Sequence, residues 1–272
     1  MQVPEETSDR PGERSADGER ISLSVLQEQV GDHVGADPEG VQAVLFDEIE
    51  GGDGMSKVIG VMGESGSGKT TSMRELDPNT TVYIDCDKKG LNWKGWRNDY
   101  NEDRKNYMRI DHFENVLAML ERVDEEETFK DVKIIVIDTL NGMMVREEMN
   151  ILAMKSGDKR SAWNDLAQNG WRIINKALAL RDDLTVIIVC HSETISDDNG
   201  IVRTRIKTNG RKLEKLVLES KMTTVVWAIR KDGEYKFILS ADGSTCKVPL
   251  GAFDTDTIPN NITLVLKALE EY

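Results

Sequence analysis

The sequence lacks the features of secreted and membrane-spanning proteins. Only three cysteines occur in 272 residues, at positions 86, 190 and 246. They are odd in number and form no close pair, and two of them end apolar runs, so we expect buried free thiols rather than a disulfide framework. The first twenty residues are polar and charged, so we expect no signal peptide. Apolar runs such as Val186–Cys190 are too short to cross a bilayer. These absences favour a cytoplasmic protein without membrane partners.

Acidic charge is concentrated at the N-terminal end of the chain. Residues 1–54 hold 14 acidic against 3 basic side chains, which accounts for −11 of the formal net charge of −14. Residues 1–20 have almost no large apolar side chain and are expected to be disordered, whereas Ile21–Val30 and Val41–Ile49 have loosely helical apolar spacing. We therefore expect an acidic, largely disordered tail over 1–54 and a folded domain over 55–272 that can still present a basic face.

From Lys57 onward, apolar runs alternate with amphipathic stretches, which is typical of a mainly parallel sheet covered by helices. Strands are expected at Val58–Met62, Thr81–Ile84, Tyr107–Ile110, Ile134–Ile137 and Thr185–Cys190. Helices are expected at Lys69–Leu76, Phe113–Val123, Leu140–Lys155, Ser161–Leu180 and Thr263–Glu271. After His191 the pattern predicts strands at Ile201–Ile206, Thr224–Ile229 and Tyr235–Leu239, with a short helix near Arg211–Leu218. The fold class is therefore α/β, a mainly parallel central sheet flanked by helices with a C-terminal β-hairpin extension.

A phosphate-binding loop follows the first expected strand. It consists of Gly63, Glu64, Ser65, Gly66, Ser67, Gly68, Lys69 and Thr70, which match G-x-x-x-x-G-K-[ST] between a strand and a helix. Glycines let the backbone N–H groups face phosphates, and the N-terminus of the following helix adds positive potential. Lys69 is predicted to reach the β- and γ-phosphates and Thr70 to ligate Mg²⁺, and Thr71 is predicted to bind the nucleotide together with the loop. We therefore predict ATP and Mg²⁺ as ligands; the alternative is a Gly-rich turn that binds nothing.

The apolar strand Ile134–Ile137 is followed directly by Asp138 at a distance from the loop that suits a Walker B element. Asp138 is predicted to hold the Mg²⁺ water shell from the side opposite Thr70. Buried strands often end in Asp at a turn, so this signal depends on its pairing with the phosphate loop.

Hydrolysis of ATP also needs a carboxylate that orients or deprotonates the attacking water. Many P-loop ATPases carry Glu directly after the Walker B Asp, but here Thr139 stands in that place. Asp85 and Asp87 end the second strand, and alternate residues of a strand point to the same side. We favour Asp87, which is nearer the end where ligands of open α/β sheets bind. Asp85 remains the alternative base, and helix capping or a solvated turn the alternative role of Asp87.

The fifth expected strand ends at Cys190 and is followed by His191. A polar residue at the end of an apolar strand next to Asp138 can donate a hydrogen bond to the γ-phosphate and report hydrolysis. A satisfied structural histidine is the alternative. The predicted catalytic residues are thus Lys69, Asp87, Asp138 and His191.

In this order, these residues resemble the RecA-like ATPases of bacteriophages, which are related to the phage single-strand annealing and recombination ATPases. The resemblance runs from about Lys57 to the C-terminus, and its narrower signals are the stretches Asp87–Trp93 and Arg205–Arg211. It implies a RecA-like P-loop NTPase in the cytoplasm of a bacterial host, acting as a homo-oligomer, with Asp87 as catalytic acid and His191 as sensor. Bacterial recombinase has Glu and Gln at these positions, and the shorter acid suggests slow turnover.

A basic segment follows His191, with five bases and no acid in ten residues: Arg203, Arg205, Lys207, Arg211 and Lys212. The first three alternate, so a strand would place them on one face. Such a row suits the phosphates of single-stranded DNA, or an arginine finger given to the ATP of a neighbouring subunit. A solvated charged hairpin is the alternative.

Aromatic and basic residues also interleave between Trp93 and Tyr100. Nucleobases could stack there, or the rings could pack under a long loop.

The sequence as a whole predicts a Mg²⁺-dependent P-loop ATPase that acts on single-stranded DNA in phage recombination or replication. Two alternatives stay open. One is a P-loop small-molecule kinase that uses the basic segment as a lid, and the other is an ATP-switched binding or assembly protein with little hydrolysis.

Overall fold

The computed structural model describes residues 55–196, 200–209 and 217–272. The tail expected over 1–54 lies outside these residues, as do Arg211 and Lys212. The helix expected near Arg211–Leu218 also lies mostly outside them, and a short 3-10 helix, η5 (Leu218–Lys221), begins where the description resumes.

The described residues form a nine-stranded sheet in the order β3-β2-β4-β5-β1-β7-β8-β9, with β6 paired to β5 alone. Six strands are parallel to their neighbours: β1 (Lys57–Gly63), β2 (Thr81–Asp85), β3 (Tyr107–Met108), β4 (Ile134–Asp138), β5 (Thr185–Ser196) and β7 (Thr224–Lys231). Antiparallel pairing adds β6 (Val202–Ile206), β8 (Glu234–Ile238) and β9 (Thr257–Pro259). The expected α/β class, with a mainly parallel sheet and an antiparallel C-terminal hairpin, is confirmed.

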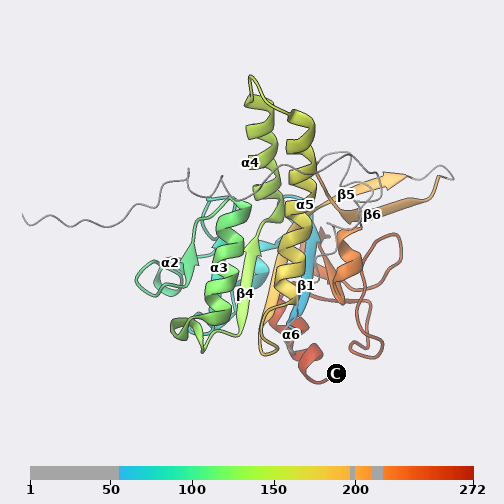
Figure 1. Cartoon of the computed structure of the whole chain (residues 1–272). Helices are drawn as coiled ribbons and strands as arrows, with labels where there is room; N and C mark the ends of the chain where they lie inside the picture. Colours follow the sequence, from blue (N-terminus) through green and yellow to red (C-terminus); the bar gives the residue numbers. More distant parts are fainter. Residues whose placement is uncertain (1–54, 197–199, 210–216) are drawn as a thin grey trace, which may run out of the picture. The chain divides into compact units, whose positions relative to one another are not determined.

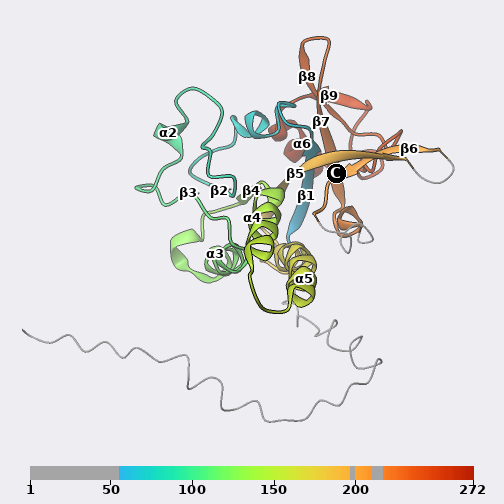
Figure 2. The same ribbon diagram turned by 90° about the horizontal axis from the view of Figure 1, so that it is seen from above.

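Helices cover both faces of the sheet. On one face lie α3 (Phe113–Glu125), α4 (Leu140–Ala153) and α5 (Lys159–Leu178), and on the other lie η2 (Thr70–Met73), α2 (Trp96–Asp99) and α6 (Ile262–Glu270) (Figures 1 and 2). Residues of β4 show the division, because Ile135 and Ile137 pack in the first layer and Val136 in the second. Burial on both faces explains why the central strands are near-continuous apolar runs.

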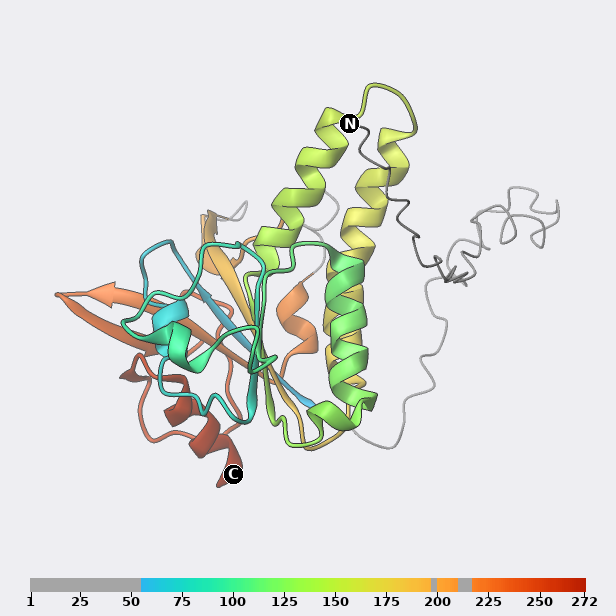
Figure 3. The same ribbon diagram turned by 90° about the vertical axis from the view of Figure 1, so that its left-hand side faces the viewer.

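The ends of the two longest helices reach beyond the sheet. Figure 3 shows the end of α4 and the start of α5 standing clear of the strands, joined by the turn between them. All three cysteines are buried and free, as expected.

The helix expected at Lys69–Leu76 is wrong in type and length. Only the 3-10 helix η2 forms, over four residues. The hydroxyl of Ser72 donates to the carbonyl of Lys69 at 2.6 Å, a local bond of the kind that competes with α-helix formation. Pro78 also disfavours helical backbone at the residue before it. A helix of four residues adds little positive potential at the phosphate site, so the contribution expected from a longer helix dipole is small.

Other boundaries differ for simpler reasons. Strand β5 runs six residues past Cys190 because its second half leaves the parallel sheet and pairs with β6. The strand expected at Tyr107–Ile110 has only two residues. Helix α2 and strand β9 were not expected, since four and three residues carry no periodic signal.

The aromatic cluster after Asp87 is part of the core. Trp96 and Tyr100 are 7% and 2% exposed. Trp96 packs against Tyr107, and Tyr100 against Tyr83, with ring centroids 5.1 Å and 5.7 Å apart. Base stacking on Trp96 or Tyr100 is therefore wrong, and the packing alternative is right for both rings.

Candidate nucleotide site

The phosphate loop leaves β1 between β5 and β7, its two parallel neighbours. Gly66 and Gly68 have φ angles of 81° and 90°, a region that favours glycine. A side chain at Gly63 would meet the carbonyl oxygen of Ala228 at 2.5 Å, so that glycine permits close approach to β7. The glycines at positions 63, 66 and 68 are thus required by the backbone path.

Lys69 points back into this loop. Its Nζ donates to the carbonyl oxygens of Gly63 at 2.8 Å and of Glu64 at 2.7 Å, and the residue is 6% exposed. Burial lowers the pKa of Lys69 from 10.5 to about 8; the charge of Asp138 opposes this shift and that of Lys89 adds to it. The ammonium is therefore poorly solvated, which favours its transfer to phosphate oxygens.

Asp138 ends β4 beside the loop. Its Oδ2 accepts hydrogen bonds from Thr70 Oγ1 at 2.7 Å and from Tyr83 OH at 2.6 Å. Burial raises the pKa of Asp138, although both hydrogen bonds act to lower it. Burial also raises the pKa of Tyr83 well above 10, so Tyr83 stays a donor.

The donor set around Asp138 fits Mg²⁺ with a nucleotide. Asp138 Oδ1 and Ser67 Oγ are buried and have no hydrogen-bond partner among the described residues, and such atoms call for an unseen ligand or water. The described residues contain no group of three or more His, Cys, Asp or Glu side chains able to hold a metal. Mg²⁺ needs no such group, since one carboxylate together with phosphates and waters is its usual protein environment.

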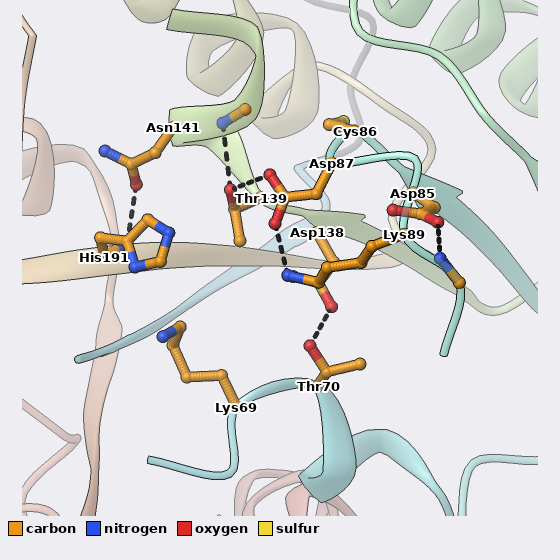
Figure 4. Close-up of polar contacts among 12 residues, drawn as sticks. Lys69, Thr70, Asp85, Cys86, Asp87, Lys89, Asp138, Thr139, Asn141 and His191 are labelled. Atoms are coloured by element: carbon orange, nitrogen blue, oxygen red, sulfur yellow. Dashed lines mark hydrogen bonds and ion pairs between the residues drawn. The ribbon is translucent and has the colours of Figure 1, made fainter. Parts of the chain in front are cut away.

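Asp85 and Asp87 have different partners (Figure 4). Asp85 is 2% exposed, and its Oδ2 accepts from Gly90 N and Tyr107 OH, each at 2.7 Å. Strand β2 ends at Asp85, so the alternation expected to align the two carboxylates does not reach Asp87. Asp85 is held inside the fold, whereas Asp87 lies beyond the strand at the edge of the sheet.

Asp87 touches the start of α4 and a lysine. Its Oδ1 accepts from Thr139 Oγ1 at 3.1 Å, and its Oδ2 pairs with Lys89 Nζ at 2.5 Å. Thr139 also caps α4 by accepting from Gly142 N at 3.0 Å. A side chain at Gly142 would come within 2.5 Å of Asp87 Oδ1. Sequence reasoning missed Gly142, and its only signal was a glycine in the first turn of an expected helix.

His191 stands opposite Gly63 in the parallel pairing of β5 with β1, next to the phosphate loop. Burial lowers the pKa of His191, and the charge of Lys69 lowers it further, so the imidazole is neutral at pH 7. A neutral imidazole still has one N–H to donate.

Asn141, which sequence reasoning also missed, ties His191 to the strand that follows. Asn141 is 3% exposed; its Oδ1 accepts from His191 N at 2.7 Å and its Nδ2 donates to the carbonyl oxygen of Lys207 at 2.9 Å. The N–H of Lys207 in turn donates to the carbonyl oxygen of His191 at 2.8 Å. No sequence signal could have found Asn141, because its partners are 50 and 66 residues away.

The structure brings Lys69, Thr70, Asp87, Asp138 and His191 together at the carboxyl ends of β1, β2, β4 and β5. Their roles stay predictions. Of the basic segment's residues that the structure describes, Arg203 and Arg205 lie apart on the hairpin of β5 and β6, and Lys207 adjoins His191. Arg203 is exposed, and Arg205 Nε donates to Glu193 Oε1 at 2.9 Å.

The family described as an AAA domain (AAA_24) matches residues 55–248. The chain belongs to this family. This AAA_24 protein is a P-loop ATP-binding protein, and its α/β fold is RecA-like, as the sequence predicted. No curated protein matches it. No helix in the described part of the chain is long and apolar enough to span a bilayer.

The solved structures that are similar to the chain include two proteins with broad coverage. One is the flagellar accessory protein FlaH from Methanocaldococcus jannaschii, at 15% identity and a TM-score of 0.34, covering 69% of this chain and 78% of that one. The other is the P4 protein from bacteriophage phi6 in complex with ADP, at 14% identity and a TM-score of 0.34, covering 70% of this chain and 57% of that one.

Proposed function

We propose that this AAA_24 protein is a Mg²⁺-dependent ATPase that works on single-stranded DNA in phage recombination or replication. The observation that carries the ATPase proposal is the position of Asp87. This carboxylate lies outside the phosphate loop and outside the expected metal ligands, yet it bonds Thr139, the residue after Asp138, and its charge acts on Lys69 of the loop.

Residues of the phosphate loop and of β4 bind the triphosphate. Lys69 exchanges the carbonyl oxygens of Gly63 and Glu64 for β- and γ-phosphate oxygens. Thr70 Oγ1 and Asp138 Oδ1, which has no hydrogen-bond partner among the described residues, would hold Mg²⁺. Mg²⁺ held there would neutralise the charge that develops on the phosphates.

Asp87 orients the attacking water and takes its proton. Oδ1 keeps its bond from Thr139, which fixes the carboxylate, and Oδ2 faces the water. His191 donates a hydrogen bond to the γ-phosphate and loses that partner after hydrolysis. Because Lys207 N donates a hydrogen bond to the carbonyl oxygen of His191, this change reaches the basic segment directly.

Single-stranded DNA as the partner rests on the basic segment and on the resemblance to phage recombination ATPases. Arg203 and Lys207 are exposed, as phosphate contacts along a strand require. We further propose a homo-oligomer, in which Arg203 or Arg205 of one subunit could serve the ATP of the next.

The test is Mg²⁺-dependent release of phosphate from ATP, measured with and without single-stranded DNA. The wild-type protein should release phosphate faster with DNA, and the Lys69→Ala protein should release none. Release that DNA does not change would remove the nucleic-acid part of the proposal. ATP binding without release would favour an assembly switch, and transfer of phosphate to a small molecule would favour a kinase.

A further inference from the structure

Two neighbouring lysines in the loop after β2 have different partners. Lys88 Nζ pairs with Asp111 Oδ1 at 2.7 Å, away from the phosphate loop, and Lys89 Nζ pairs with Asp87 Oδ2 at 2.5 Å. Sequence reasoning gave neither lysine a role. Only the second is directed toward the nucleotide site.

The loop is anchored on both sides of Lys89. Before it, Cys86 N donates to the carbonyl oxygen of Asp138 at 2.7 Å. After it, Gly90 N donates to Asp85 Oδ2 at 2.7 Å, and a side chain at Gly90 would meet Trp96 at 3.0 Å. Lys88 and Gly90 both have positive φ, at 55° and 82°. These contacts fix the backbone conformation of the loop, and the fold therefore sets the direction of the Lys89 side chain.

The charge of Lys89 acts on the central residues of the site. Lys69, His191 and Asp138 all lie within the electrostatic reach of the Lys89 ammonium. In the view of Figure 4 the Lys89 side chain, which is bonded to Asp87, overlaps that of Asp138. Two ammonium groups, Lys69 and Lys89, therefore face one site from different elements, and an anion between them would relieve their repulsion.

We propose that Lys89 is a second phosphate-binding lysine, which leaves Asp87 for the γ-phosphate when ATP binds. The side chains of Lys89 and Asp87 are 51% and 20% exposed, and ion pairs with such exposure are weak. A terminal phosphate carries more charge than one carboxylate, so the exchange favours ATP. ADP has no γ-phosphate, and the lysine then stays on Asp87.

The exchange links binding to chemistry, and this part rests on the proposed ATPase function. With Lys89 on the γ-phosphate, Asp87 Oδ2 is free to accept the proton of the attacking water. The water oxygen bonds to the γ-phosphorus, and the bond to the bridging oxygen breaks with its electron pair left on ADP. Lys89 balances charge on the γ-phosphate oxygens during this step, as an arginine finger does from outside.

The experiment compares full-length wild-type, Lys89→Gln and Lys88→Gln proteins. Affinities for ADP and for a non-hydrolysable ATP analogue are measured with Mg²⁺ by calorimetry. Lys89→Gln should weaken analogue binding by about 10- to 100-fold, as expected for a lost charged hydrogen bond, and leave ADP binding unchanged. Lys88→Gln should preserve the ratio of the two affinities. Lys89→Arg should restore part of the preference for the analogue.

An unchanged ratio in Lys89→Gln would overturn the inference. An equal loss of both nucleotides would also overturn it, because it would make Lys89 a structural support of the loop. Failure of the proposed function looks different. A wild-type protein that releases no phosphate, yet prefers the analogue through Lys89, keeps the phosphate contact and loses only the ATPase proposal.

Discussion

At the scale of single residues, two carboxylates two positions apart have separate environments. Asp85 satisfies a loop N–H and a tyrosine hydroxyl inside the fold, and Asp87 meets a threonine and a lysine at the edge of the site. Spacing in the sequence could not separate them. The distinction arises because β2 ends between them and the chain turns.

Exchange of each carboxylate for its amide should therefore affect different properties of the protein. Asp87→Asn should lower the rate of ATP hydrolysis by about 10²–10⁴-fold, the usual worth of a general base, with unfolding free energy unchanged. Asp85→Asn should cost about 1–3 kcal/mol of stability, because buried donors lose a charged acceptor. Urea unfolding and single-turnover phosphate release measure the two effects. The reverse pattern would assign the base to Asp85.

The pKa of Lys69 predicts a proton uptake on nucleotide binding. Free protein loses the Lys69 proton as pH rises through about 8, whereas phosphates favour the charged ammonium and raise its pKa. Below pH 7 both states are protonated, and affinity should not depend on this group. Above pH 8 affinity should fall about tenfold per pH unit. Calorimetry in buffers of different ionisation enthalpy should find about half a proton taken up near pH 8. Constant affinity from pH 7 to pH 9.5 would show that Lys69 stays charged without nucleotide.

At the scale of elements, the first turn of α4 connects three parts of the site. Thr139 caps the helix and bonds Asp87, Gly142 leaves room for that carboxylate, and Asn141 holds His191 and Lys207. One helix start thus fixes the expected base and the expected sensor together.

Asn141→Asp should separate the sensor from the basic segment. Aspartate keeps an oxygen for His191 N but loses the donor to the Lys207 carbonyl and places charge against it. Amide exchange of residues 202–209 should speed up, and the effect of ATP on their exchange should shrink. Nucleotide affinity should stay within about threefold of the wild-type value, since the Asn141 side chain bonds His191 and Lys207, which lie outside the phosphate loop. Exchange that still responds fully to ATP would mean that the signal takes another path.

Elements that obey a period or a fixed spacing were predictable from the sequence. The central strands are apolar because both sheet faces are buried, and the phosphate loop has fixed spacing. The α-helix expected after the loop failed because local hydroxyl bonding and Pro78 override apolar spacing. Asn141 and Lys89 act through partners placed by the tertiary fold or by a tight turn, and neither leaves a periodic trace.

At the scale of the whole molecule, the charge that the sequence places on the basic segment is partly neutralised. Arg205 is paired with Glu193 across the hairpin of β5 and β6, with side chains 21% and 27% exposed. Arg203 and Lys207 are exposed, and Thr204 and Ile206 are buried on the opposite face. The row of three alternating bases thus consists of two outward charges and one ion pair.

Substitution of these bases should therefore give unequal effects on single-stranded DNA binding. Arg203→Gln and Lys207→Gln should each weaken binding. Each should also make the slope of log affinity against log salt shallower by about 0.7, because binding with one phosphate contact fewer releases fewer counterions. Arg205→Gln should change the slope less, since its guanidinium is already matched by Glu193. ATP affinity should stay unchanged in all three proteins. Filter binding at several salt concentrations gives the slopes.

The same variants test whether the segment serves a neighbouring subunit. If Arg203 acts as a finger in trans, Arg203→Gln should abolish hydrolysis while DNA binding persists. Mixing it with Lys69→Ala protein should then restore activity, because a mixed interface pairs an intact loop with an intact arginine. Arg205→Gln should behave as wild type in this mixture. If all three variants have the salt slope and the turnover of the wild-type protein, the segment is a solvated charged hairpin. The structure would then no longer support single-stranded DNA as the partner.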